Sequence, residues 1–503
     1  MWRYGVSTST GSDVSGKVRT IGIIGAGFAG LSSAKVLKEF GYEVTVFEKE
    51  SEVGGVWTSS RRYPGLGTQN VRSTYALSDY PYQKGTPEWP SGEQVQKYIA
   101  GYVKKNDLGS HIKFNETITS ATQDPATNAW ALTLASGATH TFDYLIVCNG
   151  IFSDPFIPTF EGQDAFLAAG GRICHTTQFN HAEDARGKNI VVVGYGKSSC
   201  DVANALVGMA ASTTIVARKL IWKVPKKFKN VLNYKMLLLT RMGEALFPYI
   251  DRKGFEKFIH GRGKAVSKSM VGSVQSVITS QFKLNELNLH PHTGLDTIVR
   301  STVSLASDGF FDKIKSGELV VERDATVIRM EPGFLHLSNG KKLPADIVIC
   351  GTGFYQRIPF FSPELHAKVT DERGNFRLYR QMLPLNVRNL MFNGYNSSFL
   401  SQLNAEMGAL WIAAYLNGGL KLPSETEMNH HMNARLAWME ERTEGKHAKG
   451  TNIIPFSMHN VDELLGDLHL SVGPLVHAKE WLLPIDPRNY AKFTPQLRKR
   501  LGK

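Results

Sequence analysis

A strand that runs into a glycine-rich turn and then a helix, present twice, constrains the fold of this chain more than any other feature. Residues 20–24 form an apolar run that enters the turn Gly25-Ala-Gly27-Phe-Ala-Gly30, and a helical pattern and a second apolar run at 43–48 follow. Glycines permit the tight turn and let backbone N–H groups at the helix N-terminus approach a pyrophosphate. The pattern predicts a βαβ dinucleotide-binding unit, with these residues at the cofactor: Gly25, Gly27, Phe28, Ala29 and Gly30.

The same pattern returns 169 residues after the first glycine. An apolar run covers 189–193, a helical pattern begins at 197, and another apolar run covers 213–217. Two copies, each between a strand and a helix, favour nucleotide binding over purely structural glycine turns. The second turn supplies a further set of candidate cofactor residues: Gly194, Tyr195, Gly196, Lys197, Ser198 and Ser199.

The residues that end the second strand of each unit distinguish the two predicted sites. Glu48, followed by Lys49, stands 23 residues after the first glycine, where an acid accepts hydrogen bonds from a ribose 2′-hydroxyl. The same offset in the second unit gives Ala217, followed by Arg218 and Lys219. An acid repels a 2′-phosphate, whereas Arg and Lys bind one. The first site thus suits FAD or NAD and the second suits NADPH; the alternative for Arg218 is a solvated strand end.

A weaker internal repeat indicates the domain organisation. The segments 143–150 and 346–353 are both apolar runs that begin with Asp and end with Gly. One such run after each nucleotide unit predicts an α/β protein with two Rossmann-like domains, the second inserted into the first. A core helix is expected within 400–419. The predicted parts are a flexible arm at 1–17, a discontinuous FAD-binding domain at 18–170 and 330–503, and an NADPH-binding domain at 171–329 with a helical insertion at about 225–300.

The net charge of +13, from 58 Lys and Arg against 45 Asp and Glu, is local. Eight basic residues and no acid lie between Arg218 and Gly243, and the chain without them has a net charge of +5. Beyond the predicted phosphate ligands, the stretch from Lys223 to Arg241 is interpreted as a solvated basic face beside the NADPH site, with peripheral contact to a membrane surface as the alternative. No recognition motif accompanies the charge, so nucleic acid is excluded as a partner.

The remaining composition excludes several classes. The four cysteines form no CxxC or CxxxxC pair, which argues against a disulfide framework or a disulfide reductase and for a reducing, cytoplasmic location. The first 17 residues contain no secretory signal, and no run approaches the roughly 20 apolar residues of a spanning helix. His290-x-His292 and His430-His431 have no thiol or carboxylate at ligand spacing, so no metal site is predicted.

Several shorter motifs accompany the two turns. They are Gly54-Gly55-Val56-Trp57, Val147-Cys-Asn149-Gly150 with Asp154-Pro-Phe-Ile-Pro158, Gly171-x-x-x-His175-x-x-x-Phe179, Gly194-x-Gly196-x-Ser198-x-x-Asp201, and Gly351-Thr352-Gly353-Phe354. With the first turn they span about two-thirds of the chain. In this combination the chain resembles the class B flavin-dependent monooxygenases, a family of flavin-containing monooxygenases, N-hydroxylating enzymes and Baeyer–Villiger enzymes.

The resemblance implies that NADPH reduces bound FAD, that O2 then adds at the flavin C4a to give a (hydro)peroxyflavin, and that one oxygen passes to a small organic substrate. The family's amide beside the reactive edge of the flavin falls on Gln69, with Asn70 adjacent, and both are candidate catalytic residues. His175 is a third candidate, with a hinge role between the domains as the alternative. The resemblance also implies cofactor contacts at Gly55, Val56, Trp57, Gln69, Asn149, Gly351, Thr352 and Gly353.

Two motifs point to different branches of this family. Phe179 favours oxygenation of a nitrogen or sulfur centre, because Baeyer–Villiger enzymes usually carry Trp at that position. Arg62-Tyr63-Pro64-Gly65 is similar to the Baeyer–Villiger branch, and Ala169 stands where the fingerprint around His175 begins with Phe. We expect an N- or S-oxygenating monooxygenase. The alternatives are Baeyer–Villiger oxidation of a ketone and, in another class, a flavin-binding regulator that responds to NADPH without turnover.

Overall fold

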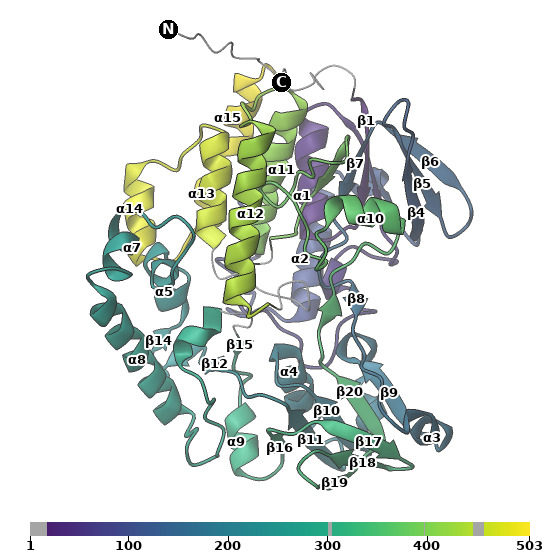
Figure 1. Ribbon diagram of the computed structural model, residues 1–503, viewed down its shortest axis with the longest axis vertical. Helices are drawn as coiled ribbons and strands as arrows, with labels where there is room; N and C mark the ends of the chain where they lie inside the picture. The colour runs from purple at the N-terminus through teal and green to yellow at the C-terminus, as the bar shows by residue number, and fades with distance from the viewer. Residues whose placement is uncertain (1–17, 300–303, 397, 446–456) are drawn as a thin grey trace.

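The computed structural model describes residues 18–299, 304–396, 398–445 and 457–503. The predicted arm at 1–17 lies outside the described residues. Figure 1 shows two α/β units, one above the other, with a layer of helices along one side of both. Each unit is built on one of the two glycine-turn motifs, so the predicted α/β class with two Rossmann-like domains is confirmed.

The upper unit is a five-stranded parallel sheet with the first glycine-turn motif at its centre. Helix α1 (Phe28–Glu39) connects two neighbouring strands of the sheet, and α11 (Ser401–Leu416) packs against α1. Nearly all of α11 is buried, which confirms the core helix expected within 400–419. The strand order is β22 (Leu390–Phe392), β7 (Tyr144–Val147), β1 (Thr20–Ile24), β2 (Glu43–Phe47) and β3 (Ile112–Lys113).

The lower unit repeats this arrangement. Helix α4 (Lys197–Leu206) follows its central strand, and all strand pairs are again parallel. The central strand carries Ile190, Val191 and Val192, all essentially inaccessible to solvent, as expected for a parallel sheet covered on both faces. The strand order is β9 (Arg172–His175), β20 (Ile347–Cys350), β10 (Asn189–Val193), β11 (Ser212–Ala217) and β16 (Val320–Arg323).

The two Asp-to-Gly repeats have the same structural role. The carboxylate of Asp143, just before β7, accepts a hydrogen bond from the backbone N–H of Thr20 at 2.8 Å. The carboxylate of Asp346, just before β20, accepts one from the N–H of Asn189 at 2.7 Å. Each aspartate therefore fixes the start of the central strand beside its own strand.

This pairing makes the predicted return to the first domain at residue 330 wrong. Strand β20 lies between β10 and β9, so the chain leaves the lower sheet only after Cys350. The hairpin strands β17 (Val327–Glu331), β18 (Phe334–Leu337) and β19 (Lys342–Pro344) also pack on this unit, through Met330 and Leu335. The error has a physical cause: the sheet that an apolar strand joins is decided by distant partners, which the strand's own sequence does not name.

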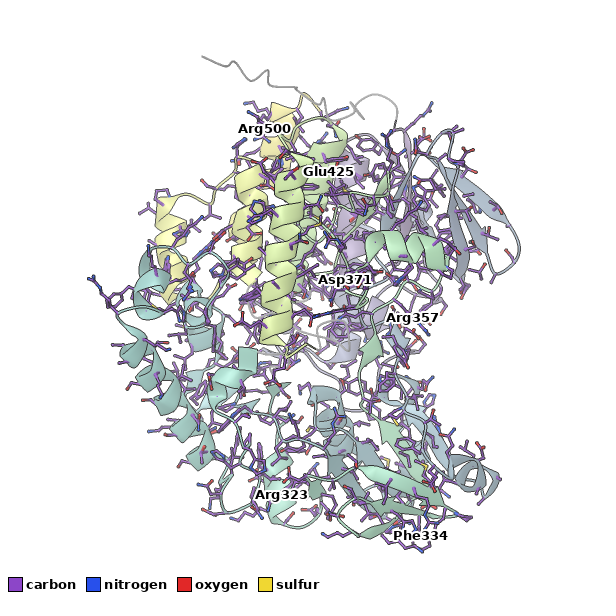
Figure 2. All side chains as sticks on the ribbon, viewed as in Figure 1. Arg323, Phe334, Arg357, Asp371, Glu425 and Arg500 are labelled. Carbon is purple, nitrogen blue, oxygen red and sulfur yellow. The ribbon has the colours of Figure 1, made fainter. Side chains whose placement is uncertain are left out.

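The chain crosses between the units twice, and the two crossings pair with each other. Strand β8 (Asp154–Pro155) carries the chain down, and β21 (Phe354–Tyr355) carries it back as the antiparallel partner of β8. Arg357, which follows β21 where the two units meet (Figure 2), forms an ion pair with Asp154. We call this pair of strands the linker ribbon.

The segment at 225–300, expected to be helical, is described up to residue 299 and also contains an antiparallel strand pair that was not predicted. It holds α5 (Lys235–Leu238), α6 (Arg241–Ala245), α7 (Gly254–Ile259), α8 (Lys264–Gln281), β13 (Lys227–Phe228) and β14 (Leu232–Asn233), and the parallel pair β12 (Lys223–Val224) and β15 (Ser304–Leu305) flanks it. The C-terminal helices are α12 (Glu425–Arg442), α13 (Ser457–Asp467), α14 (Pro474–Leu482) and α15 (Phe493–Arg500). The other main elements are α2 (Gly92–Lys105), β4 (Ile118–Gln123), β5 (Trp130–Leu134), β6 (Thr139–Phe142), α3 (Gln163–Ala168), α9 (Phe310–Lys315) and α10 (Pro363–Val369). Within the described ranges, no helix combines the length and the apolar character needed to cross a bilayer.

Buried ion pairs join the insertion to the C-terminal helices. Arg241 at the start of α6 is buried, and its guanidinium binds Asp462 of α13 at 2.5 and 2.9 Å and Glu480 of α14 at 3.0 Å. Close by, His459 lies between Glu244 at 3.2 Å and Glu256 at 2.7 Å. These two carboxylates hold the pKa of His459 at about 10 against the opposing effect of burial. We call these residues the ionic cluster.

The basic stretch is therefore not one solvated face, and its interpretation as a single surface is wrong. Lys223 is buried, and its Nζ donates to the carbonyl of Tyr195 at 2.6 Å. Lys226 forms an ion pair with Asp308, and Lys235 forms one with Glu88. Counting charges along the chain does not distinguish a buried, paired cation from an exposed one.

Candidate functional site

The first glycine turn has no room for side chains and leaves the helix N-terminus open. Gly25 has a φ of +104°, and a Cβ there would lie 2.6 Å from the carbonyl oxygen of Cys148. A Cβ on Gly30 would lie 1.8 Å from the carbonyl oxygen of Gly25. Helix α1 begins after Gly27 without any side-chain cap, so the amides of its first turn, at Phe28 and Ala29, remain for an anion. This cradle fits a pyrophosphate.

Glu48 closes the same turn from the end of β2. Its buried carboxylate accepts hydrogen bonds from the backbone N–H of Ala26 at 2.7 Å and of Glu50 at 3.0 Å. Burial raises the pKa of Glu48. The neighbouring Lys49 is exposed. The acid therefore lies beside the glycines, where the sequence placed a ribose ligand.

The second loop of the first unit is held against the glycine turn. The N–H of Gly54 donates to the carbonyl of Ala26 at 3.1 Å, and a Cβ on Gly55 would lie 3.3 Å from the Cα of Gly27. Val56 and Trp57 follow, with Trp57 buried edge-to-face on Tyr75 at 5.8 Å between ring centroids. The structure thus brings the two predicted parts of the first site together.

The second glycine turn repeats the geometry with one change. Gly194 has a φ of +116°, and a Cβ there would lie 2.7 Å from the carbonyl oxygen of Gly351. A Cβ on Gly351 would lie 2.0 Å from Oγ of Ser199, the residue that takes the place of Gly30. Gly196 has open space around it, and α4 begins after it at Lys197 without any side-chain cap. This turn also has room and free amides for a pyrophosphate.

Arg218 and Lys219 are the exposed cations of the second site. Both follow the end of β11, the strand that neighbours the glycine turn, and both are exposed. Neither has an ion-pair partner among the residues that the structure describes. Unpaired cations at this position fit a 2′-phosphate.

A loop of the upper unit packs on the helix of the second turn. The hydroxyl of Tyr63 donates to Oγ of Ser198 at 3.0 Å. A Cβ on Gly65 would lie 2.7 Å from the carbonyl oxygen of Asp201. Lys197 binds the Asp201 carboxylate at 2.5 Å. The Arg62–Gly65 motif therefore has a structural role at the junction of the two units.

The two candidate amides lie between the upper unit and the helical insertion. Asn70 is buried; its Nδ2 donates to the carbonyl of Phe399, and its Oδ1 accepts from the hydroxyl of Tyr234 at 3.1 Å. The Oε1 of Gln69 accepts from the backbone N–H of Leu305 at 3.1 Å. Both amides are oriented by neighbours, and Tyr234 is a site residue that the sequence did not reveal.

Asn149 is held by a second unpredicted tyrosine. Its Oδ1 accepts from the hydroxyl of Tyr395 at 2.6 Å, and its Nδ2 donates to Ser153 at 3.4 Å. The Gly351-Thr352-Gly353 segment begins the return crossing, and Thr352 donates to the carbonyl of Phe156 beside the linker ribbon. This segment thus joins the second nucleotide turn to the ribbon.

His175 lies at the linker ribbon. It is 1% exposed, its Nδ1 accepts from the backbone N–H of Thr177 at 3.3 Å, and its ring packs edge-to-face on Phe354 at 4.7 Å. Burial lowers the pKa of His175 to about 4. A neutral, buried imidazole against β21 favours the hinge alternative over a catalytic role, and we interpret His175 as a positioning residue.

Other chemistry has little support within the described residues. The four cysteines are all buried and free, and burial raises the pKa of Cys148 and Cys350 to about 12. In the described part of the chain, no group of three or more His, Cys, Asp or Glu side chains is arranged to hold a metal ion. The site can therefore hold two dinucleotides and supply hydrogen bonds between them.

A family model described as "Flavin-binding monooxygenase-like" matches residues 18–470 of this chain. The chain belongs to this family. The expected flavin cofactor and flavin-dependent monooxygenase activity are thereby confirmed.

Relatives within the family are distant in sequence and share the fold. Human "Dimethylaniline monooxygenase [N-oxide-forming] 4" is 26% identical, over 82% of this chain and 72% of its own length. The S-allyl-L-cysteine S-oxygenase of Allium sativum superposes with a TM-score of 0.62 at 18% identity, covering 96% of this chain and 93% of its own. The cyclohexanone monooxygenase of Rhodococcus sp. Phi1, solved with NADP+, gives 0.66 at 17% identity, with coverage of 89% and 97%.

Proposed function

We propose that this flavin-dependent monooxygenase binds FAD at the first glycine turn and NADPH at the second, and that it oxygenates a nitrogen or sulfur centre of a small organic molecule. The cofactor assignment rests on the contrast between Glu48 and the Arg218–Lys219 pair. The relatives named for an N-oxide, an S-oxygenated product and bound NADP+ are consistent with it. When bound, the flavin supplies the activation of O2 with electrons from NADPH.

The observation that carries the reaction class is the neutral character of the site between the units. Gln69, Asn70 and Tyr234 offer hydrogen bonds there and carry no charge. Transfer of an electrophilic oxygen to an amine or sulfide needs such hydrogen bonds and the exclusion of water. Attack on a ketone by an anionic oxygen would in addition gain from a nearby free cation.

The cation closest to this region in the strand pairing is already engaged. Lys223 pairs in β12 with Ser304, which precedes the Leu305 that binds Gln69. Its ammonium donates to the Tyr195 carbonyl at 2.6 Å and to Ser304 Oγ at 2.9 Å, and burial lowers its pKa. The charge is thus spent on positioning the second glycine turn, which favours heteroatom oxygenation.

Tyr234 orders this site through one hydroxyl. It donates to the carbonyl of Gln69 at 2.5 Å and lies 3.1 Å from Oδ1 of Asn70. Tyr234→Phe should loosen both amides and increase the H2O2 released per NADPH consumed, because water then reaches the activated oxygen. Tyr415→Phe is the matched control, since Tyr415 stacks on Trp411 in α11. Equal release from both variants would contradict the role of Tyr234.

The proposal is tested with the purified flavoprotein. NADPH is added without air, the flavin spectrum is followed, air is admitted, and products from a tertiary amine, a sulfide and a cyclic ketone are analysed. We expect bleaching by NADPH and oxygenation of the amine or sulfide. Conversion of the ketone alone would establish the Baeyer–Villiger alternative, which the packing of the Tyr63 loop and the cyclohexanone monooxygenase neighbours favour. If the flavin never bleaches, the alternative of a regulator without turnover holds.

A further inference from the structure

Exposed apolar side chains gather on one edge of the helical insertion. Among the residues that the structure describes, fourteen large hydrophobic side chains are exposed, and half of them lie on or next to α7, α8 and α14. Leu475 is 79% exposed, Leu482 is 70% and Phe258 is 53%. We call this the edge patch, and its core members are Phe255, Phe258, Val266, Leu475, Leu482 and Leu483.

These side chains form one continuous surface. The ring of Phe255 on α7 meets Trp481 of α14 edge-to-face at 5.9 Å, which joins the insertion to the C-terminal segment. The ring of Phe258 covers the start of α8, where a Cβ on Gly263 would lie 2.8 Å from it. Figure 1 shows α7 and α14 side by side at the outer edge, with α8 continuing along it. A contiguous exposed patch of this kind marks an interaction surface.

The charges around the edge patch are almost all positive. None of the basic side chains on α7, the start of α8 and the turn before them has an ion-pair partner within the described ranges. Of the acids nearby, Glu256 and Glu480 face inward to the ionic cluster, and only Asp251 is exposed. The exposed cations are Arg252, Lys253, Lys257, Arg262, Lys264 and Lys268.

The apolar residues are held outward by a fixed base. Glu256 of α7 binds His459, and Glu480 of α14 binds Arg241, so the carboxylates between the exposed positions anchor both helices to the interior. Buried charge pairs of this kind are costly to break. The exposure of Phe255, Phe258 and Leu482 is therefore a property of the folded helices.

We propose that the edge patch docks on the surface of an anionic lipid bilayer, with its aromatic and leucine side chains in the interface and its cations against the head groups. Apolar residues ringed by unpaired Lys and Arg are the pattern of an interfacial surface. A second copy of this chain would present the same unpaired cations and be repelled. The proposal replaces the basic stretch of Lys223–Arg241 with a different surface, because those two end residues are buried.

The test is co-sedimentation of the FAD-loaded full chain with vesicles of phosphatidylcholine alone or with about 30% phosphatidylserine, at low and physiological salt. We expect binding to the anionic vesicles that weakens with salt. The variant Phe258→Ser with Leu482→Ser should reduce binding about tenfold or more, as should Lys257→Glu with Lys264→Glu, since each cation near the surface contributes about one kcal/mol. NADPH oxidation should stay at the parent level.

The control variant carries Leu167→Ser and Ile328→Ser, two exposed apolar residues on α3 and β17 of the lower unit. It should bind vesicles as the parent does. The proposal is overturned if the parent does not sediment with anionic vesicles at low salt, or if the control loses as much binding as the patch variants. It is also overturned if the patch variants instead dissociate a dimer of the parent that ignores vesicles.

Discussion

Replacing Arg218 by Ala removes an exposed cation that has no partner in the described part of the chain, so the fold should lose little stability. A hydrogen bond between a charged donor and a phosphate is worth about 1.5–3 kcal/mol. Solvent and salt screen an exposed residue and place it at the lower end of that range. We therefore expect the KM for NADPH to rise about tenfold in Arg218→Ala, and about 100-fold when Lys219→Ala is added.

The assay measures steady-state oxidation of NADPH and of NADH by each variant. NADH has no 2′-phosphate, so its KM should change by less than about twofold. Lys188→Ala is the matched control, because Lys188 is also exposed but precedes β10 at the opposite end of the sheet. A similar loss for both cofactors, or an equal effect of Lys188→Ala, would refute the assignment of this pair to the 2′-phosphate.

Three further predictions concern packing and protonation. Arg241→Met leaves Asp462 and Glu480 without their cation and should lower the free energy of unfolding by about 3–5 kcal/mol in urea titrations; an unchanged midpoint would show that the cluster contributes nothing. Gly351→Ala places a Cβ 2.0 Å from Oγ of Ser199, and it should cost about 1–3 kcal/mol and weaken NADPH binding. Adding Ser199→Gly should largely restore both quantities, and the absence of rescue would refute this source of strain. Burial raises the pKa of Glu406 on α11 from 4.5 to about 7, so its contribution to stability is present below pH 4.5 and is lost as the pH rises to 7. Glu406→Gln should therefore exceed the parent in stability by about 3 kcal/mol at pH 8 but not at pH 4, as denaturant titrations at the two pH values would measure; the same difference at both would contradict a buried, titrating carboxyl.

Local signals carried the correct part of the sequence predictions. Gly25 and Gly194 adopt positive φ in turns whose next residues start a helix, and both needs are encoded within six positions. Glu48 and Arg218 end strands at a fixed offset from those turns. Such features depend on chain geometry over a few residues, so a single sequence reveals them.

The missed features all depend on distant partners. Tyr234 lies 164 positions from Asn70, and Tyr395 lies 246 from Asn149. Arg241 finds its carboxylates 221 and 239 positions away, so its burial left no local trace. Contacts over such separations are decided by how the two units and the C-terminal helices pack, and no periodicity or spacing encodes that packing.

The linker ribbon brings both ends of the lower unit to one place, since Asp154 pairs with Tyr355. By that criterion alone the lower unit is a cassette that could be exchanged between relatives with two adjacent splice points. The ionic cluster prevents so simple an exchange, because it ties the unit's insertion to α13 and α14 on the opposite side of the molecule (Figure 1). A working chimera must therefore take Asp462 and Glu480 together with Arg241, although they lie far beyond the splice points in the chain.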